Sequence, residues 1–388
     1  MKRLLQYIAI LIVTLAATAF NLTAAAPKDN PEIFNPIQVA IPILSVSPDA
    51  RASGMGDMGV ATLPDANSQH WNPAKYPFVN STIGGSVSHI PWLRSLVNDV
   101  SITYLTVYYQ FSKDQSISTS LRYFSLGEMT IIDQDRHELD KVSPYEMAWD
   151  VSYSRKFGDN FSIGLTLRYM HSNLTGGFEY SNESFGSMEP ANVFGADLGF
   201  FYRNAQSRTS EYSAGLCLSN LGTKVSYTDY TDKYFLPMTL KFGGTYTYHI
   251  DEDNSIMGGL EISKLLIPTP PVVSGDTLIK GYDDNVGVIQ GAFQSFYDAP
   301  FGWKEELSEY MLGVGGEYAY RSQFFGRAGF YYDSKRKGNR RYLTFGAGLR
   351  YSFLGIDLAY YFPFTNNDPM ANTIKISVLF NFGELGDR

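Results

Sequence analysis

The residues that could carry chemistry are few, and they are scattered along the chain. Its five histidines stand at His70, His89, His137, His171 and His249. His171 and Ser172 together hold the two side chains of a Ser-His hydrolase, but neighbouring residues of a strand point to opposite faces. The sequence contains no metal-ligand cluster, phosphate-binding loop or cofactor motif, and the single cysteine, Cys217, cannot form an intrachain disulfide. We therefore expect no catalytic residue, no cofactor and no metal ion.

The composition narrows the class of protein that must position these residues. Of 388 residues, 28 are Tyr and 26 are Phe, while only 18% are charged and the net charge is −8. The mean hydropathy is nevertheless −0.16, so the aromatic residues must alternate with polar ones. Such a chain is too aromatic for a disordered protein and too acidic for a typical DNA-binding domain. Only its N-terminus has the run of about 20 apolar residues that a membrane-spanning helix needs.

The N-terminus has the features of a secretory signal peptide. A basic start at 1–3 is followed by an apolar stretch at 4–20 and by small residues at 23–26. We expect cleavage after Ala25, which assigns 1–25 to the signal peptide, and an uncleaved membrane anchor is the alternative. The mature protein is then exported from the cytoplasm.

From Ser81 onward the chain repeats segments in which apolar and polar residues alternate. In the last segment one face carries Ile374, Ile376, Val378, Phe380 and Phe382. The segments are about twice the length of an ordinary strand, enough to cross a bilayer at a tilt. We predict an all-β fold, a transmembrane antiparallel β-barrel over 81–388. The fourteen expected strands are 81–93, 99–112, 115–129, 146–157, 160–174, 191–204, 211–220, 235–250, 254–266, 309–321, 323–335, 341–354, 355–365 and 373–383.

The links between the expected strands alternate between short and long, as they do in outer-membrane barrels. This alternation places both ends of the strand series, and in our expectation both chain termini, on the periplasmic side. The longest outer loop is expected at 267–308. Fourteen strands enclose a lumen too wide for wall side chains to fill, so a plug or a passage must occupy it. Inner glycines such as Gly346 and Gly348 predict free space there, and tyrosines such as Tyr108 and Tyr361 predict interfacial girdles.

In residues 26–80, which precede the barrel, apolar and polar residues do not alternate. We expect this segment to form a plug, or hatch, inside the lumen rather than a disordered tail. Glycines there allow close backbone approach or a positive φ, and an Asn-Pro pair favours a turn. The block resembles the N-terminal motif of the FadL-like outer-membrane proteins, in which a hatch with an Asn-Pro-Ala turn blocks a fourteen-stranded barrel. The residues that carry the resemblance are Arg51, Gly54, Met55, Gly56, Trp71, Asn72, Pro73 and Ala74.

Within that family the chain, through Phe382, most resembles the PorV-like proteins, also called LptO. The resemblance implies a non-enzymatic outer-membrane component of the type IX secretion system. It further implies that the protein binds secreted cargo by the cargo's C-terminal domain at the translocon, called Sov or SprA. The cargo then passes to the surface sortase PorU and its attachment complex, which joins it to lipopolysaccharide. A FadL-type transporter of hydrophobic small molecules and a lipid A deacylase are the alternatives, and pattern does not separate the related PorQ and PorP barrels.

Two loop segments are candidate contact surfaces. The loop 267–308 holds aromatic residues outside any expected strand, which either bind the translocon or cargo or bury one another over the barrel mouth. These residues are Phe293, Phe296, Tyr297, Phe301 and Trp303. The link 335–341 is basic in an acidic chain, which favours contact with lipopolysaccharide phosphates or a partner, or else a solvated turn. Its basic residues are Lys335, Arg336, Lys337, Arg340 and Arg341.

Overall fold

The computed structural model describes most of the chain, and from Asn35 onward the described residues belong to one compact unit. The expected signal peptide at 1–25 lies outside the described residues. Both chain termini lie outside them too, so their periplasmic position stays a prediction. The described ranges are 34–92, 99–132, 137–178, 181–182, 186–228, 233–275, 277–364 and 373–384.

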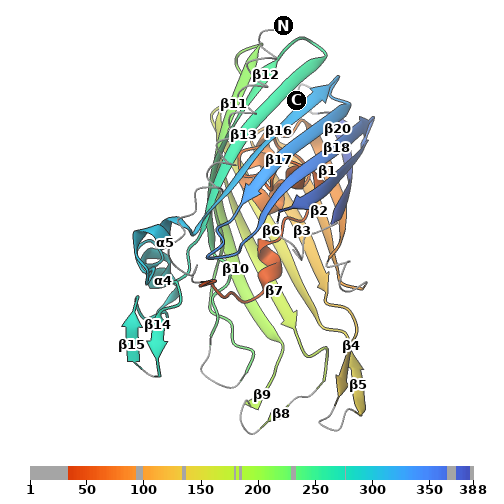
Figure 1. Cartoon of the computed structure of the whole chain (residues 1–388). Coiled ribbons are helices and arrows are strands. Elements are labelled where there is room, and N and C mark those ends of the chain that lie inside the picture. Colours follow the sequence, from red (N-terminus) through yellow and green to blue (C-terminus); the bar gives the residue numbers. More distant parts are fainter. Residues whose placement is uncertain are drawn as a thin grey trace. The chain divides into compact units, whose positions relative to one another are not determined.

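Within these ranges, fourteen strands form a closed antiparallel barrel, which confirms the predicted fold class (Figure 1). The barrel closes because β1 pairs with β2 on one side and with β20 on the other. In order round the barrel the strands are β1 (Ser81–Pro91), β2 (Ser101–Ser112), β3 (Gln115–Ser125), β6 (Tyr145–Phe157), β7 (Phe161–Asn173), β10 (Ala191–Asn204), β11 (Ser210–Gly222), β12 (Thr239–His249), β13 (Asn254–Leu265), β16 (Tyr310–Tyr320), β17 (Phe324–Tyr332), β18 (Arg341–Tyr351), β19 (Leu354–Pro363) and β20 (Ile374–Glu384).

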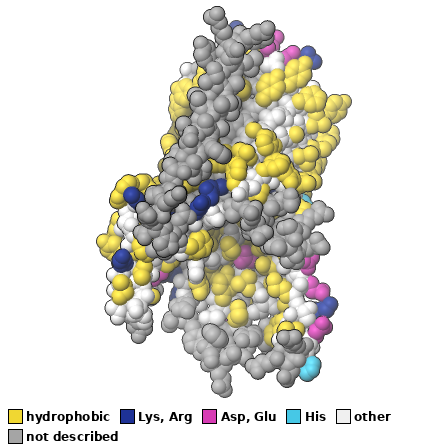
Figure 2. All heavy atoms as spheres, in the orientation of Figure 1, with side chains coloured by type: hydrophobic (Ala, Val, Ile, Leu, Met, Phe, Trp, Pro, Cys, Tyr) yellow, Lys and Arg dark blue, Asp and Glu magenta, His cyan; other side chains and the backbone are white. Residues whose placement is uncertain are grey.

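The strands follow the predicted alternation closely. Lys375 and Ser377 of β20 are buried in the lumen, whereas Ile374 and Ile376 are exposed on the outer wall. Hydrophobic side chains gather over the outer wall of the strands in Figure 2. Lipid covers such a surface in an outer-membrane barrel, and the polar inner face is left for the lumen.

Several tyrosines expected in the interfacial girdles lie in the lumen instead. Tyr108 is 1% exposed and Tyr361 is fully buried, whereas Tyr109 is 44% exposed on the outer wall. The girdle prediction is wrong for Tyr108 because neighbouring strand residues must face opposite sides. The Tyr361 hydroxyl donates a hydrogen bond to Asp57 of the hatch at 2.8 Å, so a lumenal tyrosine helps to hold the plug.

The links at one end of the barrel are long and contain short strands and helices, and we call this end the long-link end. The opposite, short-link end holds the paired residues Ser81 and Glu384 of β1 and β20. Within the described residues, no helix is long and apolar enough to cross a membrane. The elements of the long links are β4 (Met129–Ile132), β5 (Glu138–Val142), β8 (Ser181–Asn182), β9 (Gly186–Ser187), β14 (Val272–Ser274), β15 (Thr277–Lys280), α4 (Val288–Gln294) and α5 (Trp303–Leu307).

The segment before β1 runs through the lumen from one end of the barrel to the other. At the long-link end, the Asn35 amide donates to the carbonyl of Arg336 at 2.9 Å. From there the segment passes inside the barrel, coloured red to orange in Figure 1, and reaches Ser81 at the short-link end. Its short helices are η1 (Pro42–Ser45), α2 (Ala50–Ser53), α3 (Ser68–Trp71) and η2 (Pro73–Phe78).

Candidate functional site

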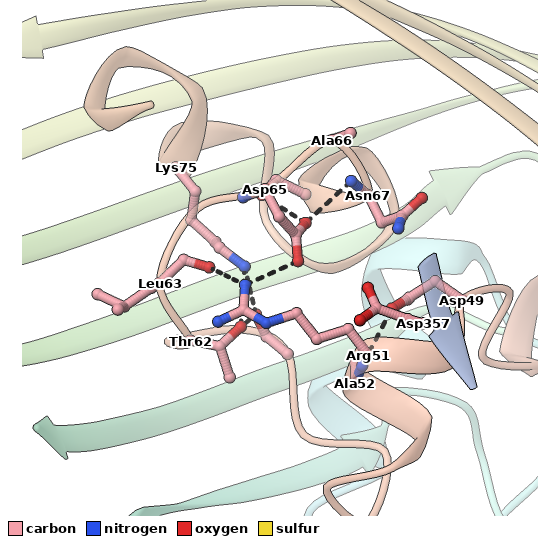
Figure 3. Close-up of polar contacts among 12 residues, drawn as sticks. Asp49, Arg51, Ala52, Thr62, Leu63, Asp65, Ala66, Asn67, Lys75 and Asp357 are labelled. Atoms are coloured by element: carbon pink, nitrogen blue, oxygen red, sulfur yellow. Dashed lines mark hydrogen bonds and ion pairs between the residues drawn. The ribbon is translucent and has the colours of Figure 1, made fainter. Parts of the chain in front are cut away.

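Arg51 of α2 joins two parts of the hatch to the barrel wall. Its guanidinium forms ion pairs with Asp65 of the hatch at 2.9 Å and with Glu317 of β16 at 3.0 Å. It also donates to the carbonyl of Leu63 at 2.9 Å, and Figure 3 shows Arg51 pointing towards Leu63 and Asp65. Glu317 in turn binds Arg327 of β17 at 2.6 Å. A buried ion-pair network therefore fixes the hatch, because each charge needs its partner once water is excluded.

The Asn-Pro-Ala motif forms a turn that is bonded on both sides. The Asn72 Oδ1 accepts a hydrogen bond from the Ala74 amide at 3.1 Å, which caps η2, and Pro73 suits the first position of that helix. The Asn72 Nδ2 donates to the carbonyl of Val60 at 3.1 Å and to that of Phe200 in β10 at 2.9 Å. One side chain thus connects two hatch segments and the wall.

Glycines of the inner wall let the hatch backbone lie directly against the strands. A Cβ atom on Gly329 would lie 2.1 Å from the Gly56 nitrogen, and one on Gly346 would lie 3.1 Å from the Gly54 Cα. The expectation of free space beside Gly346 is therefore wrong, because the hatch fills it, and beside Gly348 wall side chains do so. Sequence reasoning missed this role, although glycines repeated on inner strand positions were its signal. Hatch atoms crowd further wall glycines in the same way, namely Gly164, Gly199, Gly215, Gly313 and Gly315.

Burial also shapes the electrostatics of the hatch. The Trp71 indole donates to Asp49 at 2.6 Å, and burial, followed by the charge of Asp65, raises the pKa of Asp49 to about 6. The Lys75 ammonium donates to the carbonyl of Gly59 at 2.9 Å, and burial lowers its pKa to about 8. Both shifts mark groups taken out of water and held by hydrogen bonds, as expected inside a packed plug.

A cavity of about 90 Å³ lies between the hatch and the wall, and its lining mixes aromatic and charged side chains such as Trp71, Trp92, Lys241 and Glu261. Glu261 accepts hydrogen bonds from the amides of Gly59 and Val60 at 2.7 and 2.8 Å, so it is occupied in holding the hatch. Pockets for small organic ligands usually measure about 300–1,000 Å³ and are mostly apolar.

The long loop at 267–308 is anchored to the barrel mouth by buried charges. The Lys264 ammonium at the end of β13 binds Glu306 of α5 at 3.0 Å and Glu309 at 2.5 Å. The Asn35 side chain donates to the carbonyl of Pro270 at 3.1 Å, which ties the start of the loop to the start of the lumenal segment. In Figure 1, α4 and α5 lie together beside the long-link end. The loop is thus a folded unit with a fixed position.

Most of the aromatic residues singled out in this loop face solvent. Phe301 is half-buried, and the Lys280 ammonium lies 5.5 Å from its ring centre. The others are exposed by 42% to 71%, and they are Phe293, Phe296, Tyr297 and Trp303. We call Phe293, Tyr297 and Trp303, the most exposed three, the aromatic surface.

The basic link is used partly within the protein. The Lys337 ammonium is buried and binds Glu305 at 2.9 Å and Glu309 at 3.0 Å, so it anchors the long loop. Arg340 pairs with Asp333 at 3.1 Å. The Lys337 contacts connect the two candidate surfaces, which sequence reasoning treated as separate. The other basic side chains are exposed or half-buried, and they belong to Lys335, Arg336 and Arg341.

His171 and Ser172 do not form a catalytic pair in this arrangement. The Ser172 hydroxyl is buried and donates to Glu146 at 2.9 Å. The His171 Nδ1 instead contacts the Asn192 side chain at 2.9 Å, on the opposite face of β7. Their separation follows from the strand alternation.

The comparison with solved structures gives a FadL-like barrel. The chain is 12% identical to the CymD monoaromatic hydrocarbon channel, with 91% of this chain and 100% of that chain covered and a TM-score of 0.51. The TodX deltaS2S3 mutant monoaromatic hydrocarbon channel gives 13% identity, 86% and 99% coverage and a TM-score of 0.51. The P. putida toluene transporter TodX is 12% identical, with 87% of this chain and 99% of that chain covered and a TM-score of 0.50. At such identities the similarity establishes the fold alone.

A closed fourteen-stranded barrel with an N-terminal segment bonded into its lumen has the FadL-like fold. The chain belongs to the PorV family, because residues 29–272 match the family model described as type IX secretion system protein PorV. Family membership assigns it to that system and to the outer membrane. A search of curated proteins finds no significant match.

Proposed function

We propose that this protein is a non-enzymatic cargo-binding component of the type IX secretion system. It receives secreted proteins by their C-terminal domains at the Sov/SprA translocon and passes them to the sortase PorU and its attachment complex. The long-link end then faces the cell exterior, where lipopolysaccharide surrounds the barrel. The observation that carries this proposal is the match of residues 29–272 to the PorV family.

The filled lumen supports a binding role over a conduction role. Arg51, Asn72 and Glu261 each join the hatch to itself or to the wall, and glycines bring the backbones into contact. Moving such a plug would break several buried ion pairs and hydrogen bonds at once, and each charge left buried without its partner costs several kcal/mol. A folded cargo protein would therefore be held by the outer loops, and of these the anchored loop 267–308 offers the aromatic surface.

The aromatic surface can be tested by a triple substitution of Phe293, Tyr297 and Trp303 to serine. We expect co-purification of the translocon or of cargo with the tagged protein, quantified by mass spectrometry, to fall by about tenfold or more. The barrel should remain as stable as before, because these three side chains are 60–71% exposed.

Leu139→Ser is the matched control, since Leu139 is an exposed apolar residue of β5 in another long link. If the triple variant recovers as much translocon and cargo as the wild-type protein, the aromatic surface does not bind these partners. If the wild-type protein brings down neither translocon nor cargo, the proposed function itself fails.

The shared barrel fold favours a transporter of hydrophobic small molecules as a second candidate. Such a transporter needs a ligand pocket or an opening in the wall. The cavity beside the hatch measures about 90 Å³. A lateral opening would need a break in strand pairing, but β1 pairs with both neighbours at Gly84 and Gly85, and β12 does so at Gly243 and Gly244. Both observations favour the secretion role. Recovery of a lipid-like ligand with the purified barrel would reverse this preference.

The lipid A deacylase alternative makes a prediction about Ser172. Because its hydroxyl donates to Glu146 and lies on the other face from His171, Ser172→Ala should leave the acyl chains of lipid A unchanged. Mass spectrometry of lipid A from a strain that carries this variant checks the prediction. The control is Ser162→Ala, because Ser162 is another buried lumenal serine of β7. A change in the number of acyl chains relative to this control would favour the deacylase alternative.

A further inference from the structure

A compact group of carboxylates lies inside the folded part of the long loop. Asp298 precedes α5, Glu306 belongs to it and Glu309 follows it. One carboxylate oxygen from each of the three lies within 4.8 Å of those of the other two. Thr269 adds a hydroxyl, which bonds to Glu309 at 2.5 Å.

The three carboxylates are not equally compensated by the lysines around them. The Lys264 ammonium contacts Glu306 and Glu309, and the Lys337 ammonium contacts Glu309. Asp298 forms no ion pair within the described part of the chain. With Glu305 included, four carboxylates face two ammonium groups, which leaves two negative charges at the base of the loop.

The excess of negative charge is one indication that a cation binds here, and the Asp298 side chain is a second. It is 0% exposed, and while its Oδ2 accepts a hydrogen bond from the Thr269 amide at 3.0 Å, its Oδ1 has no partner within the described residues. A buried carboxylate oxygen without a partner is costly.

We propose that Asp298, Glu306 and Glu309 bind a calcium ion that locks the base of the long loop. Calcium prefers six to eight oxygen ligands at about 2.3–2.6 Å, so oxygens on opposite sides of the ion lie about 4.8 Å apart. One oxygen from each of the three carboxylates lies within this distance of the other two, and the Thr269 hydroxyl and water would be further oxygen donors. One divalent cation also balances the two uncompensated charges. The site does not depend on the cargo-binding role, and only its access to extracellular calcium rests on the outward orientation proposed above.

The location gives the ion a structural consequence. The three ligands flank or belong to α5, which begins at Trp303 of the aromatic surface, and Glu309 is one residue from the start of β16. Calcium would therefore hold α5 against the barrel mouth. Ligand sets of this kind on extracellular modules bind calcium at about 0.1–1 mM, a range suited to a protein surface outside the cell.

The experiment uses the full mature chain in phosphatidylcholine nanodiscs, because anionic lipids bind calcium themselves. Tryptic cleavage after Lys280 and Lys304 reports on loop folding, and terbium luminescence sensitised by the loop aromatics reports binding directly. We expect about 2 mM calcium to slow cleavage by about tenfold relative to a chelator and to displace terbium.

Asp298→Asn keeps an oxygen acceptor for the Thr269 amide but removes the charge, and it should abolish both calcium effects. Glu252→Gln, in the exposed turn before β13 at the short-link end, should retain them. Heat-modifiable mobility on gels shows that each barrel has folded. The proposal is overturned by a wild-type protein without a calcium response, by an Asp298→Asn response equal to that of wild type, or by an equal effect of magnesium.

Discussion

Among substitutions that add one methyl group to the inner wall of the barrel, Gly329→Ala is expected to reduce the amount of folded protein most. The new Cβ would lie 2.1 Å from the Gly56 nitrogen and 2.2 Å from the Met55 carbonyl carbon. Both are backbone atoms of the hatch, so no side-chain rotation relieves the clash. Overpacking of a dense core costs about 1–3 kcal/mol, and we expect the upper end or more here. The amount of heat-modifiable barrel in outer-membrane fractions measures the effect.

Gly326→Ala is the matched control on the same strand. Gly326 faces outwards, and a Cβ there meets nothing within 4 Å. Its barrel should accumulate to the wild-type level. Equal accumulation of the Gly329→Ala and Gly326→Ala barrels would mean that the hatch does not pack against β17 as described.

Glu317→Gln should destabilise the plugged barrel nearly as strongly. Glu317 lies between Arg51 of the hatch and Arg327 of the wall, and all three side chains are buried. The amide keeps the shape of the side chain but leaves one buried positive charge uncompensated. Breaking a buried pair in this way typically costs about 3–5 kcal/mol. Urea unfolding of the purified barrel, followed by tryptophan fluorescence, gives the change in unfolding free energy.

An exposed ion pair provides the comparison for this second prediction. Glu128 and Lys141 pair at 3.0 Å with side chains that are 57% and 61% exposed, so Glu128→Gln should cost about 1 kcal/mol or less. Protease digestion of the hatch adds a second readout, because only the Glu317 variant should make the lumenal segment accessible. Similar urea midpoints for the two variants would refute the role assigned to the Arg51–Glu317 contact.

The barrel could be predicted because its information is local. Each strand alternates along its own sequence, so β20 could be recognised from the spacing of Ile374, Ile376 and Phe382 alone. The edges were less certain, since turns tolerate many residues: the strand expected to end at 129 ends at Ser125, and the one expected to start at 235 starts at Thr239.

The site could be predicted only in part because its contacts are long-range. The hatch motif was recognisable, but the partner of Arg51 lies 266 residues away at Glu317. No periodicity links Lys337 to Glu305 either, although this contact turns a basic link into an anchor of the long loop. The helices α4 and α5 also escaped prediction, because short helices depend on packing rather than on their own propensity.

The path of the lumenal segment bears on how the barrel assembles. Asn35 lies at one end of the barrel and Ser81 at the other, and the segment between them bonds to several strands of the wall. We expect the strands to assemble around this segment rather than the segment to enter a closed barrel. Successive strands are joined along the chain, whereas β1 and β20 come from opposite ends of the strand series and meet only at the seam. In such an assembly the N-terminal segment lies inside an open sheet until β1 and β20 pair.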